Sequence, residues 1–280
     1  MKLSRYITFF LALAIVACTT TPYYRHESRA LNIIRAGGVY DTDIYDSEDG
    51  MKSYGKSFLM QVLNFASLAT SFQGSTALGL GGGANFIKNS ALILAEPENA
   101  SGRPSFLAWA PQQLAEDKFK ARDHILNVVQ TALKNTETDM NITIKHLPQG
   151  KKDPIINKIP FEFWDVTAPD LGCHNGSCAV AIYIKNPYEI STPEFLEEAI
   201  GKKCYELSAT GRKDYSRIIF YQVDERTFPE KDFYQTLSKN LPLWTALYFP
   251  PNSIHQNGEP LNYPVVFEKG EMLLFKKPKH

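Results

Sequence analysis

The hydrophobic period of this chain changes near Asp139, and this change constrains the fold more than any other feature. Over residues 112–134, apolar side chains recur at helical spacing opposite a charged face, which predicts the longest helix of the chain. From Asp139 onward the period falls to two, because Ile142 and Ile144 alternate with polar neighbours as in a half-buried strand. We therefore expect an α+β fold, with a helical N-terminal half and a mostly antiparallel sheet with inserted helices in the C-terminal half.

The C-terminal half contains repeated short apolar runs that read as strands. They are residues 161–166, 179–185, 204–208, 217–223 and 244–249, with a final hairpin that joins 264–268 to 272–276 over Lys269-Gly270. Two helices are also expected there. Ser191 to Glu194 and Thr227 to Glu230 each resemble a capping box with proline in the first turn, and these helices should end near Gly201 and Pro242.

Residues 57–87 contain no charged side chain at all. Residues 57–72 have the period of an amphipathic helix, followed by the glycine-rich run 79–83 and the mostly apolar run 84–95. This stretch is interpreted as buried core, with a membrane-associating or oligomerising hairpin as the alternative. The spacing Gly79-x-Gly81-x-x-Ala84 does not indicate a dinucleotide site, because no strand clearly precedes it and no alternating strand-helix series follows.

The N-terminus predicts export. Lys2 and Arg5 form a short positive region, and residues 6–17 are apolar apart from Thr8. This run is shorter than the roughly 20 residues that span a bilayer, but it has the size of a signal-peptide core.

The end of this signal, Ile15-Val16-Ala17-Cys18, resembles the lipobox of bacterial lipoproteins. The resemblance implies cleavage before Cys18, a diacylglyceryl thioether on its sulfur and a fatty acid such as palmitate on its new amine. It covers only the first 20 or so residues, and an ordinary secretory signal or a short buried helix is the alternative. In this family Thr19, which is not Asp, implies the periplasmic face of the outer membrane, with the inner membrane and the cell surface still open.

We divide the chain on this basis into four parts. They are a signal peptide (1–17), a tether (18–30), a helical region with the glycine-rich apolar segment (31–138) and an α+β region (139–280).

With Cys18 lipidated, Cys173, Cys178 and Cys204 remain. Asn175-Gly176 predicts a tight turn between the first two, so a Cys173–Cys178 disulfide fits an exported protein. Cys178–Cys204 stays open as the alternative pairing, since connectivity cannot be deduced from sequence. A metal site from these cysteines with His174 is disfavoured, because the spacing is not a zinc pattern.

Charge excludes one class of partner. Lys and Arg together number 30, as do Asp and Glu, so the chain has no excess positive charge for nucleic acid. The acidic run 41–50 also fails as a calcium loop, because Asp46 and Lys52 stand where that motif needs Gly and Glu.

No motif for catalysis is found, so we nominate no catalytic residue, metal ligand or cofactor. Glu197-Glu198 is interpreted as a solvated helix face, and His255 as part of a polar surface loop that has a binding site as its alternative.

The hypothesis that follows is a lipid-anchored envelope protein. It would bind protein partners in secretion, conjugation or surface assembly, with the membrane contacted through its N-terminal lipid. The alternatives are an anchored cell-wall or polysaccharide hydrolase, and a module that binds small ligands or glycans.

Overall fold

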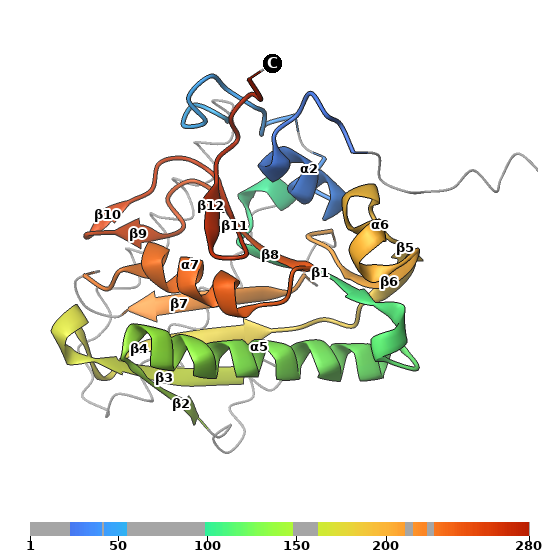
Figure 1. The fold of residues 1–280 in the computed structure, drawn as a ribbon. Helices are drawn as coiled ribbons and strands as arrows, with labels where there is room; N and C mark the ends of the chain where they lie inside the picture. Colours follow the sequence, from blue (N-terminus) through green and yellow to red (C-terminus); the bar gives the residue numbers. More distant parts are fainter. Residues whose placement is uncertain are drawn as a thin grey trace, which may run out of the picture.

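The computed structural model describes residues 23–40, 42–54, 99–147, 162–210, 215–222 and 227–279 (Figure 1). Within them, six strands form the larger sheet in the order β12-β11-β8-β1-β6-β5, with every pairing antiparallel. Its strands are β1 (Ser105–Pro111), β5 (Tyr188–Ser191), β6 (Lys203–Leu207), β8 (Thr245–Phe249), β11 (Val265–Glu268) and β12 (Glu271–Leu273).

A second antiparallel sheet has four strands in the order β2-β3-β4-β7. They are β2 (Thr143–Leu147), β3 (Glu162–Ala168), β4 (Cys173–Tyr183) and β7 (Arg217–Gln222). β9 (His255–Gln256) and β10 (Glu259–Pro260) pair as a separate short ribbon.

The described helices are α2 (Arg29–Ala36), α5 (Lys118–Met140), α6 (Glu194–Ile200) and α7 (Glu230–Asn240), with short 3-10 turns η2 (Ala100–Gly102), η3 (Gln112–Leu114) and η5 (Pro169–Leu171). Figure 1 shows α5 running along the four-stranded sheet, with α7 beside it. Two side chains of α5 reach that sheet, since Gln130 bonds Glu162 and Arg122 bonds the carbonyl of Ile184.

Helices cover both faces of the larger sheet, and the strand register shows which residues face each layer. Leu107 and Trp109 lie on the face covered by α2 and α6, where Leu107 contacts Gly37 and Trp109 packs edge-on against Phe195. The opposite face carries Phe106, Leu247 and Phe267, which are neighbours in register across β1, β8 and β11. On this face Phe267 stacks with Tyr234 of α7. The central strand β1 is therefore buried on both sides, and all seven of its residues are buried.

The expectation of a helical N-terminal half is wrong. Its residues 105–111 form β1, the strand that β8 and β6 flank, so the two halves of the chain share one sheet. The sequence did not indicate this strand because burial on both faces removes the apolar-polar alternation. The region boundary placed after residue 138 falls inside α5.

The strands and the final hairpin expected in the C-terminal half are present, shifted by a few residues. The longest helix also exists, but at Lys118–Met140 instead of 112–134. Asp117 caps its start by accepting the N–H groups of Phe119 and Lys120, and Asn141 ends it in the left-handed conformation.

The two expected capping boxes are wrong. Pro193 and Pro229 are the N-cap residues of α6 and α7, and neither helix start has a side-chain cap. The Thr227 hydroxyl donates to the carbonyl of Leu171 and accepts a hydrogen bond from the Gln222 side chain. It therefore links the segment before α7 to the smaller sheet. The predicted helix and glycine-rich run at 57–95 lie outside the described residues.

Candidate functional site

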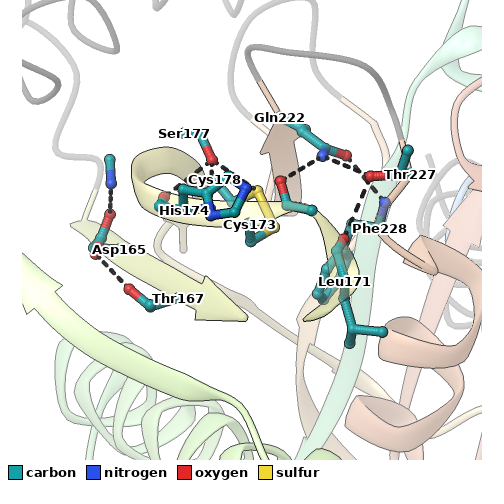
Figure 2. The surroundings of a disulfide bond; sticks show 12 residues. Asp165, Thr167, Leu171, Cys173, His174, Ser177, Cys178, Gln222, Thr227 and Phe228 are labelled. Carbon is teal, nitrogen blue, oxygen red and sulfur yellow. Dashed lines mark hydrogen bonds between the residues drawn. A yellow bond between two sulfur atoms is a disulfide. The ribbon is translucent and has the colours of Figure 1, made fainter. Parts of the chain in front are cut away.

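Cys173 and Cys178 form a disulfide, as one of the sequence interpretations predicted. Figure 2 shows that it closes a loop at the start of β4. In the register between β3 and β4, Val166 pairs with Cys178 and Ala168 pairs with Cys173. Between these two pairs, the chain advances five residues along β4 but only two residues along β3. The extra residues form a bulge, and the disulfide fixes the register on either side of it.

Hydrogen bonds hold the disulfide loop from both sides (Figure 2). The Ser177 hydroxyl accepts the N–H of His174 and donates to its carbonyl. On the side of β3, Asp165 accepts the N–H of Gly176. On the side of β7, Gln222 donates to the carbonyl of Gly172. Both cysteines are fully buried, so this bond is structural and not an exposed redox pair.

Cys204 is a free, buried thiol in β6, so the alternative Cys178–Cys204 pairing is wrong. Burial raises the pKa of this thiol to about 12, although a hydrogen bond with Thr192 acts in the opposite direction. A thiol protonated at neutral pH is a poor nucleophile and a poor metal ligand. The disulfide also occupies Cys173 and Cys178, two of the four ligands of the metal site considered from sequence.

A polar cluster lies at the end of β6. Lys185 is 2% exposed, and its ammonium donates to Ser208 and to the carbonyl of Thr210. Ser208 and Thr210 share a hydrogen bond of 2.6 Å. Sequence reasoning missed this cluster, because its residues carry no spacing motif.

Glu206 lies next to the cluster in β6, opposite Trp109 and Tyr188 in the neighbouring strands. Burial raises the pKa of this carboxyl to about 7, and the charge of Lys185 and the Trp109 side chain oppose that rise. A lysine beside a serine can support acyl-transfer chemistry, but Ser208 is 3% exposed and bonded to Thr210. The hydrogen bonds of Lys185 connect the segment after β4 to the residues that follow β6.

His255 pairs with Glu230, the first residue of α7. Its ring Nδ1 lies 3.6 Å from the carboxylate, which also accepts the backbone N–H of His255 at 3.0 Å. Both side chains are buried, so the interpretation of His255 as part of a surface loop is wrong. The pair therefore ties the β9 strand to the start of α7.

Two open hollows lie on the described surface, each about 460 Å³. The first, the anchor groove, lies between residues 23–30 and residues 272–278. The second, the η3 groove, is lined by Gln112, Gln113, Ile200, Gly201, Lys202 and Lys203. Neither contains the buried clusters around Lys185 or His255.

Several large apolar side chains are exposed on the described surface. Tyr24, Tyr40, Tyr45 and Met51 belong to residues 23–54, close in sequence to the expected anchor. Leu114, Phe119 and Tyr188, which we call the η3–β5 surface, lie on η3, α5 and β5. η3 and β5 adjoin, because Gln112 bonds Glu189, while Tyr188, the preceding residue of this edge strand, points to the other face of β5.

Cys18 and residues 57–95 lie outside the described part of the chain. Among the described residues, no group of three or more His, Cys, Asp or Glu side chains is placed to hold a metal ion. The helices within that part include none with the length and apolar character needed to cross a membrane.

No family model, no curated protein and no solved structure matches this chain.

Proposed function

We propose that this protein is a lipid-anchored bacterial envelope protein that binds a protein partner and does not act by catalysis. The observation that carries the proposal is the buried Cys173–Cys178 disulfide in a chain whose N-terminus resembles a lipoprotein signal. Disulfides persist outside the reducing cytoplasm, so the disulfide and the signal independently favour the same destination.

The chemistry of the described side chains favours binding over catalysis. The buried pair of His255 with Glu230, the Lys185 cluster and the Cys204 thiol are the groups best suited to acid-base or nucleophilic work. Each is buried, and the first two make internal contacts that hold strands or loops. This arrangement supports a structural role for them and weakens the hydrolase alternative.

The η3–β5 surface is the partner-binding region that we favour. Phe119 is 57% exposed and Tyr188 58% exposed, and Leu114 lies between the η3 groove and the start of α5. Exposed aromatic side chains beside polar groups are typical of protein interfaces, where they provide contact area and the polar groups provide hydrogen bonds.

The anchor is tested by growing cells with labelled palmitate and separating soluble periplasm from the inner and outer membranes. We expect label and an outer-membrane location for the wild type, and neither for Cys18→Ser. Unlabelled wild type in the soluble periplasm would overturn the anchor.

Partner binding is tested by placing a photo-crosslinking amino acid at Tyr188 or Phe119 in intact cells. Asn135, exposed in the C-terminal part of α5, is the matched control. A product of one defined mass at Tyr188 and Phe119, and none at Asn135, is expected. Equal products at all three positions, or none, would contradict a specific partner surface.

A further inference from the structure

We infer that residues 23–54 and 272–279 form a membrane-contacting face that rests on the phospholipid headgroups. This inference rests on the proposed lipid anchor at Cys18. The anchor groove lies in this face, and the occupant that we assign to it is the headgroup layer of the bilayer.

Chain length places this face close to the membrane. Tyr23 and Tyr24 are already bound to the fold, because the N–H of Tyr23 bonds Glu194 and that of Tyr24 bonds Asn32. Five residue steps separate Tyr23 from Cys18, which reach at most about 17 Å when fully extended. A lipid on Cys18 therefore holds residues 23–30 within reach of the headgroups.

The two segments of the face form one ordered unit. Ser47 bonds the backbone of Phe275 and of Lys277, and the Ser53 hydroxyl donates to the carbonyl of Phe275. A side chain at Gly50 would collide with Leu274, so the loop lies closely against the C-terminal segment. Figure 1 places both segments and α2 at the top of the molecule, far from α5.

The acidic side chains of this loop are engaged within the protein. Asp46 accepts the N–H of Ser28, and Glu48 pairs with Lys277. Asp49 accepts the N–H groups of Met51 and Lys52, and the bond from Met51 lowers the pKa of this carboxyl below its ordinary value. Of these contacts, the ion pair of Glu48 with Lys277 offsets one negative charge, whereas Asp46 and Asp49 stay ionised and are held in place by backbone N–H groups.

The remaining outward side chains suit a bilayer interface. Tyr45 is 44% exposed and Met51 is 49% exposed, and the exposed Tyr24 lies near the N-terminal end of the described residues. Tyrosine favours this interface because its ring is apolar and its hydroxyl is polar. In the anchor groove, Arg25 and Lys276 supply cations for phosphates beside the half-buried Met272 and Leu273.

The test uses the chain from Cys18 onward, which retains every residue that the structure describes. Its Cys18 thiol is coupled to phosphatidylcholine vesicles that carry a small fraction of maleimide lipid. Cys204 is buried and the other two cysteines are disulfide-bonded, so coupling is directed to Cys18. Chemical coupling supplies the anchor even if cells do not acylate Cys18, so failure of the proposed function and failure of this inference are separate results.

The readout is the rate at which each lysine is acetylated, measured by mass spectrometry. On vesicles, Lys52 and Lys276 should react about threefold more slowly than on uncoupled protein, because the interface shields them. Lys134 on α5 and Lys203 on β6 are the exposed controls and should not change. Equal rates at Lys52 and Lys276 with and without vesicles would overturn the inference.

A pair of variants tests the apolar contact directly. The double substitution Tyr45→Ser with Met51→Ser should abolish most of the protection at Lys52. Phe119→Ser, which removes a side chain of similar exposure in the first turn of α5, should leave that protection intact. Equal loss of protection in both variants would show that the contact is not specific to this face.

Discussion

The two sheets of this protein are stabilised in different ways. In the six-stranded sheet, β1, β8 and β11 are buried at every residue, with helices on both faces. In the four-stranded sheet, β2 is mostly exposed and β3 alternates between half-buried and buried positions. The central strands of the larger sheet therefore depend on packing, whereas β3 and the start of β4 in the smaller sheet also gain from the Cys173–Cys178 disulfide and the hydrogen bonds around it.

The largest difference between the sheets should appear when one aromatic side chain is removed from each. Phe106→Ala in β1 should lower the free energy of unfolding by about 3–5 kcal/mol, because it leaves a cavity in a fully buried strand. Phe163→Ala in β3, where the side chain is half-buried, should cost clearly less. Urea unfolding measures both, and equal losses would contradict the distinction.

Removal of the disulfide should affect the smaller sheet selectively. Replacing Cys173 and Cys178 together with Ser should cost about 2 kcal/mol, the unfolded-state entropy expected for so short a loop. Amide exchange should accelerate in β3 and β4 and stay unchanged in β1 and β8. Because Cys204 has no disulfide partner, Cys204→Ser is the control in which exchange near the β4 bulge should not change. Acceleration that is uniform over both sheets would contradict this assignment.

Tyr234 links the two sheets through its hydroxyl. It accepts the N–H of Phe220 on the edge strand β7, while its ring packs against Phe249 and Phe267 in the larger sheet. Tyr234→Phe should cost about 1–2 kcal/mol, because a buried N–H loses its acceptor. Tyr188→Phe, at an exposed position, should be neutral in the same thermal unfolding experiment. A neutral Tyr234→Phe would show that the edge of β7 is satisfied without this bond.

Glu206 should make stability depend on pH in the larger sheet. Its folded pKa of about 7 lies above the ordinary value of 4.5 for glutamate, so the folded state holds a proton that the unfolded state releases between these values. Stability should be greatest below the unfolded pKa and should be lower by about 3 kcal/mol once the pH has risen past the folded pKa. In Glu206→Gln, the urea concentration at the unfolding midpoint should depend less on pH between about pH 5 and about pH 8. A wild-type midpoint that rises over this range would contradict the sign.

Local pattern was sufficient for several features of this protein. Apolar and polar residues alternate along β2 and β3, because one face of each strand is more buried than the other. Residues 142–145 and 161–166 could therefore be identified as strands from the sequence. The close spacing of Cys173 and Cys178 around Asn-Gly likewise made their pairing the favoured interpretation.

Tertiary structure alone decided the features that depend on distant contacts. β1 has no alternation because helices cover both of its faces, and those helices come from residues before and long after it. Residues 135–140 continue α5 beyond its apolar stripe, where Lys239 and Asn240 of α7 contact Asp139, and the bond from Lys239 lowers the pKa of Asp139. The burial of His255 depends on Glu230, which is 25 residues away along the chain.

The same division applies to the candidate surfaces. The lipobox resemblance at Cys18 and the tyrosines that follow it are local sequence features, and they predict an anchor and an aromatic region near it. That residues 42–54 lie against residues 272–279 could not be predicted, because their contact joins segments more than 200 residues apart. The sequence by itself therefore determined local periodicity and chemistry, whereas long-range packing decided which groups are buried and which face outward.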